Sequence, residues 1–144
     1  VVHRAFPESP AVAAERLLLH PAGCWILSGK IGVIGYLVSH PWRFMDPPKL
    51  NSALGRLPAD ADTYYVHDLA LLPTARGGGA GTDAVGLAIQ QATAAGLGSL
   101  SLVAVSGSAP FWAHNGFRVH TDAAIQDRLK TYGSEARFMV RPLP

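Results

Sequence analysis

One short run of glycines has the residue types and spacing needed to hold a phosphate. It extends from Arg76 to Thr82 and contains four glycines. Because glycine lacks a β-carbon, the backbone there can turn tightly and bring its amide groups close to a ligand. A helix that follows would point its unsatisfied N–H groups and the positive end of its dipole at the same place. The run therefore predicts an anion-binding site built from the main chain.

Two elements must flank this loop, and the sequence predicts both of them. Residues 64–72 are rich in aromatic and branched side chains and are closed by Pro73, which is typical of a strand. Residues 82–95 place apolar side chains three or four apart, carry Asp83 in the first turn and stop at Gly96, which is typical of a helix. Gly86 lies inside this helix, where glycine costs stability, so we expect it to permit close packing on the sheet.

Three classes of phosphate-binding loop compete for this pattern. A P-loop needs a lysine directly before a serine or threonine, but Gly81 precedes Thr82 here. The order Gly79, Gly81, Ala84 fits a dinucleotide-binding loop, yet residues 84–121 offer no acidic side chain for a ribose hydroxyl. Nucleotide binding is therefore kept only as an alternative. The third candidate is a loop that binds an acyl carrier.

Two separated motifs favour that third candidate. The first is Leu69-Ala70-Leu71-Leu72-Pro73 followed by Arg76-x-x-Gly79-x-Gly81, and the second is Phe111-Trp112-x-x-x-Gly116-Phe117. In this order they closely resemble the GNAT superfamily of acetyl-CoA-dependent N-acetyltransferases, and the resemblance extends more faintly from residue 24 to residue 42. It implies an α/β (α+β) fold with a mixed, mostly antiparallel central sheet, splayed at the cofactor cleft and flanked by helices. It also implies an enzyme that transfers the acetyl group of acetyl-CoA to a primary amine by direct attack through a tetrahedral intermediate.

The resemblance also implies where the cofactor lies. In the family, main-chain amides of the loop bind the coenzyme A pyrophosphate, and the preceding strand splays from its neighbour to admit the pantetheine arm. Arg76 either pairs with a coenzyme phosphate or serves the loop structurally. Carried onto this sequence, the cofactor-binding residues are Leu69, Leu71, Leu72, Arg76, Gly77, Gly78, Gly79, Ala80, Gly81, Thr82, Phe111 and Trp112.

Acetylation of an amine needs a base, because the amine is mostly protonated near neutral pH. His67 is the preferred candidate, since an unperturbed histidine titrates at about 6.5 and a catalytic histidine of the family fills a similar position. Asp68 and a water chain without any single base remain alternatives. Adjacent strand residues face opposite ways, so His67 and Asp68 share one face only if a β-bulge intervenes.

The reaction also places charge on the carbonyl oxygen and on the departing sulfur. By resemblance, the main-chain amide of Leu71 stabilises the oxyanion, and the side chain of Leu71 is then unimportant. Many members use a tyrosine as the acid where Trp112 stands, and an indole cannot supply a proton near neutral pH. The preferred interpretation is an enzyme in which water or Tyr65 protonates the thiolate. The alternative is a non-catalytic module that senses acetyl-CoA.

The sequence indicates less about the acyl acceptor than about the cofactor. Residues 41–62 contain four prolines without a period and lie between strands that border the cleft in the resembled family. A loop of this length is typically functional, so we expect it to shape the substrate site. Tyr36, Trp42 and Tyr65 are the candidate substrate contacts, although ordinary core packing explains aromatic side chains equally well. A small-molecule or peptide amine is expected.

The remaining segments complete the predicted sheet and its helices. The sequence predicts a helix over 11–19 with Ala14, Leu17 and Leu18 as its apolar face, capped by Ser9. No strand precedes that helix and the chain begins with Val1 rather than Met, so we expect the first strand of the family to be missing. The other predicted elements are a hairpin over 23–27 and 31–38, a buried strand over 99–105, a short helix over 110–115 and a final hairpin over 117–120 and 136–141.

Composition sets limits on this interpretation. The 144 residues predict a single GNAT-like domain over 1–144, and the net charge of +2 is too small and scattered to favour nucleic acid. One cysteine excludes an internal disulfide, no apolar run is long enough to span a membrane, and the histidines lack metal-ligand spacing. We therefore expect a cytoplasmic protein without a metal. Charged residues are only 15% of the chain, so apolar surface remains that a homodimer would cover.

Overall fold

A six-stranded sheet forms the centre of the protein, whose computed structural model describes residues 10–30, 32–105 and 107–144. The strand order is β1-β2-β3-β4-β6-β5, and every neighbouring pair is antiparallel except β3 and β4. This mixed, mostly antiparallel sheet with flanking helices confirms the predicted fold class. The strands are β1 (Cys24–Gly29), β2 (Gly32–Trp42), β3 (Thr63–Leu71), β4 (Ser99–Ala104), β5 (Arg118–Val119) and β6 (Arg137–Pro142).

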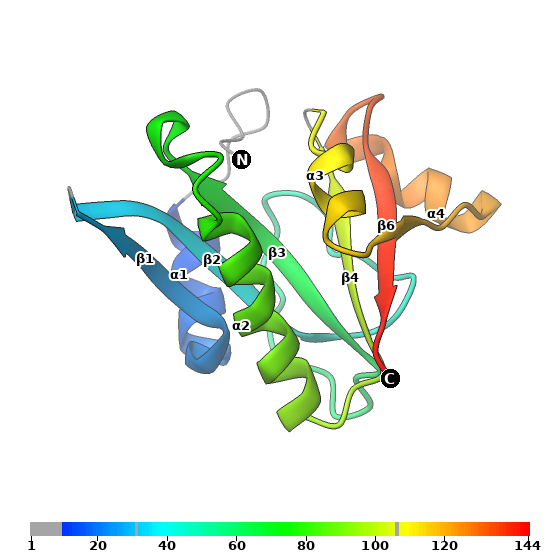
Figure 1. The fold of residues 1–144 in the computed structure, drawn as a ribbon. Coiled ribbons are helices and arrows are strands. Elements are labelled where there is room, and N and C mark those ends of the chain that lie inside the picture. The colour runs from blue at the N-terminus through cyan, green and yellow to red at the C-terminus, as the bar shows by residue number, and fades with distance from the viewer. Residues whose placement is uncertain (1–9, 31, 106) are drawn as a thin grey trace.

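Helices lie on both faces of the sheet (Figure 1). On one face α2 packs against β3 and β4 through a core in which small helix residues such as Ala84, Ala88 and Ala92 meet Leu37, Leu69 and Leu102 of the strands. The long helix thus lies close to the strands that flank the glycine loop. The helices are α1 (Pro10–Leu19), α2 (Ala80–Ala94), α3 (Ala109–His114) and α4 (Ala123–Arg128), with short 3₁₀ turns at Pro21–Gly23, Pro73–Ala75 and Leu129–Tyr132.

The opposite face of the sheet carries a second core. Ile125 of α4, together with Leu129 and Tyr132, packs there against Phe138 of β6. The segment 43–62 contributes Phe44, Met45 and Leu50 to the same core. The long loop between β2 and β3 is therefore packed onto the sheet at several points, rather than being detached from it.

The two parallel strands pair over only part of their length. Cα partners join β3 and β4 from Tyr64 and Leu100 to Val66 and Leu102, and the pairing stops there although β3 continues to Leu71. Figure 1 shows the two strands diverging beyond this point, with α3 near the open end. The predicted splay of the sheet is therefore present.

A β-bulge in β3 accompanies this splay. Val38 of β2 is opposite Asp68, but the next residue, Ser39, is opposite Val66, so His67 is the extra residue of β3. A bulge shifts the alternation of side chains, which lets two consecutive residues project from the same face. This is the condition under which His67 and Asp68 can act in one place.

Some local predictions were wrong. In α1, Leu17 and Leu18 are 53% and 84% exposed, whereas Val12 and Arg16 are buried. The sequence pattern failed because an arginine is expected in solvent rather than on the packed face of a helix. The helix α4 and the 3₁₀ turn after it were not predicted, and Asp122 caps α4 by accepting a hydrogen bond from Ala124 N at 2.7 Å.

The boundaries of the predicted elements are otherwise close to those observed. The predicted helix over 82–95 begins earlier, at Ala80, and the predicted strand that was to end at residue 38 continues to Trp42. A β-carbon at Gly86 would meet no atom within 4 Å, so the prediction that this glycine permits close packing was wrong. The Ser9 cap, Ile31 of the first hairpin and the missing first strand fall outside the described residues.

Candidate active site

The glycine loop presents main-chain amides rather than side chains. Gly77 and Gly79 adopt φ angles of 85° and 87°, which a residue with a β-carbon rarely adopts. Gly79 is the N-cap of α2 and no described side chain caps this helix. The first hydrogen bond of α2 is donated by Asp83 N to Gly79 O at 2.9 Å, so the amides of residues 80–82 have no acceptor within the helix. The loop and the first turn of α2 therefore fit a diphosphate, which such amides and the helix dipole bind well.

The second sequence motif packs against the first turn of the same helix. A β-carbon at Gly81 would lie 2.8 Å from the ring of Phe111, so only glycine allows this approach. The Phe111 ring meets Trp112 edge to face at 4.9 Å, and Trp112 meets Phe117 at 5.3 Å. The structure thus brings together two predicted cofactor-binding motifs that are far apart in the sequence.

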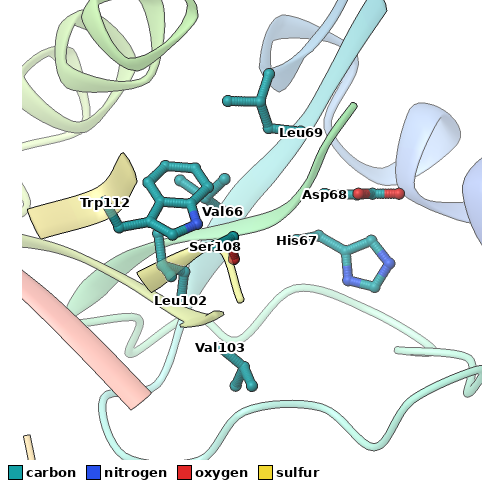
Figure 2. A pocket seen from close by; sticks show the side chains of 8 residues that line it. All are labelled: Val66, His67, Asp68, Leu69, Leu102, Val103, Ser108 and Trp112. Carbon is teal, nitrogen blue, oxygen red and sulfur yellow. The ribbon is translucent and has the colours of Figure 1, made fainter. Parts of the chain in front are cut away.

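A pocket lies where β3 and β4 diverge (Figure 2). Four of the residues that were predicted from sequence, namely His67, Asp68, Leu69 and Trp112, line it. Sequence reasoning missed Ser108, which directly precedes α3 and brings a hydroxyl group to this wall. The full lining is Val66, His67, Asp68, Leu69, Leu102, Val103, Ser108 and Trp112.

The bulge in β3 places both candidate bases on one side of the strand. In Figure 2 the side chains of His67 and Asp68 project in the same direction, away from Leu69 and Trp112. The Tyr36 hydroxyl of β2 donates a hydrogen bond of 2.8 Å to Asp68 Oδ2. One predicted substrate residue is therefore joined directly to one predicted catalytic residue, although Tyr36 is not itself part of the pocket lining.

Pairing with β2 determines the direction in which the main-chain amides after the bulge point. Leu72 N donates to Ile34 O at 2.8 Å. Because successive amides of a strand point to opposite edges, the amide of Leu71 points away from β2, toward the edge from which β4 has diverged. Leu71 itself is buried and Leu72 is partly exposed. This orientation suits the predicted role of the Leu71 amide as a donor into the cleft.

A group of rings adjoins His67 on the face opposite α2. His40 of β2 is fully buried, and its ring centroid lies 6.3 Å from that of His67 and 5.6 Å from that of Tyr65. Its Nδ1 lies 2.9 Å from Pro41 O, which fixes the proton on Nδ1. Burial lowers the pKa of His40 to about 3, so the ring is neutral at physiological pH. Sequence reasoning missed this residue, because its position depends on strand register.

The other two predicted substrate residues adjoin the same rings, Tyr65 buried and Trp42 half-buried. The Trp42 ring meets His40 at 5.5 Å, and its indole N–H donates to Asp46 O at 2.6 Å. Tyr65 is 2% exposed, and its hydroxyl lies 3.5 Å from that of Tyr132. Neither residue lines the pocket of Figure 2. The Tyr65 ring lies 6.5 Å from that of His67, whereas Trp42 contacts His40.

Other predictions are limited by what the described residues contain. Arg76 is exposed at the end of the 3₁₀ turn before the glycines. The described part of the chain gathers no three side chains of histidine, cysteine, aspartate or glutamate that could hold a metal, and the absence of a metal stays a prediction. None of the described helices has the length and apolar character needed to cross a membrane.

Comparison with known proteins agrees with this geometry. The model of the acetyltransferase (GNAT) family matches residues 3–117, which is most of the chain, and the chain belongs to that family. The cosubstrate prediction, acetyl-CoA, is confirmed at the level of this family. A search of the curated proteins found no match.

Solved structures share the fold at low sequence identity. The GNAT-like decarboxylase GphF, in complex with isobutyryl-CoA, is 13% identical with a TM-score of 0.76, and the alignment covers 99% of this chain and 89% of that one. Nourseothricin acetyltransferase is 25% identical with a TM-score of 0.57, over 81% of this chain and 62% of that one. N-acetylglutamate synthase from Neisseria gonorrhoeae, complexed with coenzyme A and N-acetyl-glutamate, is 19% identical with a TM-score of 0.59. That alignment covers 94% of this chain but only 32% of the synthase.

Proposed function

We propose that the protein is an N-acetyltransferase that moves the acetyl group of acetyl-CoA to a primary amine. The observation that carries this proposal is the bulge at His67, which sets a histidine beside the pocket at the point where β3 and β4 diverge. The glycine loop follows directly on the same strand. A site for a diphosphate and a candidate base thus lie in one continuous segment. When bound, acetyl-CoA supplies an activated thioester.

His67 acts as the base in this proposal. Imidazole is the side chain used most often as a general base near neutral pH, so His67 is preferred to the neighbouring carboxylate. Asp68 already accepts a hydrogen bond from Tyr36 and lies next to His67 in the bulge. Asp68 is kept as the second candidate, and a water chain is the third.

Two further groups would stabilise the charges that develop on the carbonyl oxygen and on the departing sulfur. The amide of Leu71 points to the open edge of β3 and would donate to the carbonyl oxygen, as a fixed donor needs no reorganisation. At the departing sulfur, Trp112 cannot supply a proton, but the Ser108 hydroxyl in the same wall can donate a hydrogen bond. Ser108 replaces Tyr65 as our candidate for that role, since Tyr65 does not line the pocket.

The relatives support acetyl transfer and leave the acceptor open. One neighbour is named as a nourseothricin acetyltransferase and the Neisseria gonorrhoeae synthase is complexed with N-acetyl-glutamate, so small amines are suitable first candidates. The NatC complex, whose structure contains a Gag peptide and coenzyme A, is 21% identical and keeps a peptide acceptor in the screen. The decarboxylase GphF has the same fold, so activity has to be measured.

The direct test is release of free coenzyme A thiol from acetyl-CoA in the presence of a panel of amines. We expect thiol release that depends on both the amine and His67. If coenzyme A protects the protein against heat but no amine releases thiol, the protein is a sensor of acetyl-CoA rather than an enzyme. If NAD or ATP stabilises it and coenzyme A does not, the glycine loop binds a nucleotide and the proposal fails.

The remaining predictions are carried into this proposal. We propose one catalytic domain over residues 1–144, a cytoplasmic location and a homodimer. Apolar side chains exposed on α1 and on the β1–β2 hairpin support the homodimer. They are Leu17, Leu18, Trp25, Ile26 and Val33. Sedimentation of the purified protein tests it, and a monomer at micromolar concentration would contradict it.

A further inference from the structure

Arg16 is a charged side chain in an unexpected place. It lies on the packed face of α1 and is 0% exposed. Its Nη1 donates to Glu15 Oε1 at 3.0 Å and to Ser52 O at 2.7 Å. Its Nε and Nη2 are also buried, and neither has a hydrogen-bond partner within the described part of the chain. One edge of the guanidinium is thus satisfied by the protein, and the other is not.

The unsatisfied Nε–Nη2 edge of Arg16 is suited to one class of ligand. The N–H groups on Nε and Nη2 are parallel, and this fork matches the two oxygens of a carboxylate. A buried donor without an acceptor is costly, and the cost is greater when the donor is charged. A ligand that carries a carboxylate would satisfy both nitrogens at once, whereas a neutral amine would satisfy neither.

The surroundings of Arg16 lead toward the candidate base. Arg16 is close enough to His40 for its charge to add to the effect of burial in lowering the pKa of that ring. His40 Nε2 is buried without a partner among the described residues. Since the proton is on Nδ1, Nε2 is a bare acceptor. A neutral acceptor therefore lies next to His67, whose ring is 6.3 Å from that of His40, and the donor fork of Arg16 lies near that acceptor.

Part of the long β2–β3 loop is hydrogen-bonded to Glu15 and Arg16 of α1. Glu15 accepts hydrogen bonds from Leu54 N at 2.6 Å and Gly55 N at 3.1 Å, while Arg16 holds Ser52 O. The loop predicted to shape the substrate site is therefore tied to α1 by the same two residues. Because Arg16 is 0% exposed, a ligand reaches the fork only after the residues packed around it rearrange.

We propose that Arg16 binds a carboxylate of the acyl acceptor, so that the acceptor is a small amine that also carries a carboxylate, such as an amino acid. This inference rests on the proposed acetyltransferase function, because it assigns the substrate class of the same site. The carboxylate takes the Nε–Nη2 fork, and the amine is directed toward His40 and His67. A peptide terminus or a polycation would not supply this pairing of one amine with one nearby carboxylate.

Matched acceptor pairs test the inference in the full chain. We would compare β-alanine with β-alaninamide, and phenylalanine with phenylalaninamide, by thiol release from acetyl-CoA. A bidentate, charge-assisted pair predicts that each acid has a kcat/KM at least about tenfold above that of its amide. Amidation lowers the pKa of the amine and would by itself favour the amide, so a preference for the acid is informative. Equal or better use of the amides would overturn the inference and leave the acetyltransferase proposal standing.

Variants separate the fork from the structural role of Arg16. Arg16→Lys keeps a cation near Glu15 and Ser52 O but has no fork, so it should abolish the preference for acids. Arg43→Lys is the matched control, since Arg43 is an exposed arginine on the β2–β3 loop that pairs with Asp60 at 3.1 Å. Thermal unfolding of each variant reports whether it is folded. A folded Arg16→Lys protein that still prefers the acids would overturn the inference.

A binding measurement makes the two proposals separable. With coenzyme A in place of acetyl-CoA no acetyl group can be transferred, and calorimetric titration then reports the affinity of the amine alone. Acid binding that is lost in Arg16→Lys, without thiol release from any amine, would keep the carboxylate site and reject the enzyme. If neither acid binds at millimolar concentration, the carboxylate site is rejected whatever the turnover.

Discussion

The two faces of the cleft are built from different parts of the chain. On the α2 side, the glycine loop offers main-chain amides in a segment of a few consecutive residues. On the α1 side, the side chains proposed to bind and deprotonate the acceptor are those of Arg16, His40 and His67, which come from a helix and two strands. The first face is local and made of backbone, whereas the second is long-range and made of side chains.

This difference determines how each face tolerates change. An amide donor survives any substitution that keeps the backbone path, so only the glycines that need their conformation or closeness are sensitive. A buried side-chain site fails when one member is replaced, because its neighbours then lose a partner. The following predictions, from the largest expected effect to the smallest, test whether the two faces differ in this way.

The largest effect is expected on the side-chain face. His67→Gln removes the base, and loss of general base catalysis typically lowers kcat/KM by about 10²–10⁴-fold. His114→Gln is the control, since His114 is exposed on α3. Steady-state thiol release measures both. If instead Asp68→Asn lowers kcat/KM by this amount and His67→Gln leaves it unchanged, Asp68 rather than His67 is the base.

On the backbone face, alanine at Gly81 should weaken the binding of coenzyme A, whereas alanine at Gly86, later in the same helix, should leave it unchanged. Gly81→Ala places a methyl group 2.8 Å from the Phe111 ring, and overpacking of this kind costs about 1–3 kcal/mol. Because the strain falls on the first turn of α2, we expect weaker binding of coenzyme A by about tenfold or more. Calorimetric titration measures it. Unchanged affinity in Gly81→Ala would mean that the close approach of Phe111 does not position the loop.

The buried ring of His40 should make folding stability depend on pH. The unfolded chain takes up a proton on His40 below about pH 6.5, while the folded protein keeps the ring neutral down to about pH 3. The unfolded state binds more protons in that window, so stability is full above pH 6.5 and falls as the pH is lowered. From pH 6.5 to 5 the loss reaches about 2 kcal/mol.

Urea unfolding at several pH values measures this dependence. The low pKa of His20, which burial also causes, adds a loss in the same direction, so the comparison with His40→Gln isolates the contribution of His40. His114→Gln again serves as the exposed control. An identical pH dependence in His40→Gln and the wild-type protein would show that His40 is not the titrating group.

A smaller effect is expected from Ser108, at the border between the two faces. If its hydroxyl donates a hydrogen bond to the departing sulfur, Ser108→Ala should lower kcat by about tenfold and leave the affinity for coenzyme A unchanged. A fall in affinity with unchanged kcat would instead assign Ser108 to binding. The comparison of kcat with the dissociation constant decides between these outcomes.

The smallest expected effect is a gain. Gly86→Ala should raise the free energy of unfolding by about 0.5–1 kcal/mol, because alanine favours the helix and its methyl group meets nothing within 4 Å. Coenzyme A affinity should not change, which makes this variant the matched control for Gly81→Ala. Thermal unfolding measures the gain, and a loss would mean that the helix packs more tightly there than the structure indicates.

Sequence reasoning succeeded where local pattern decides structure. The strand before the glycine loop, the loop and α2 were predicted because alternation, glycine spacing and helical periodicity act over a few residues. The prediction for α1 failed at Arg16 because apolar periodicity cannot recognise a buried cation that is held by Glu15 and a distant carbonyl. Gly86 was misjudged for a related reason, since a glycine inside a helix does not reveal whether anything lies beside it.

The sequence by itself determined the family and the main-chain part of the site, because both are written in contiguous motifs. Only the tertiary structure decided which side chains meet behind that site. The bulge at His67, the burial of His40 and the contact of Arg16 with Ser52 all depend on strand register and on segments that are distant in the chain. A one-residue change of register would turn every following side chain to the other face, and no short motif records that choice.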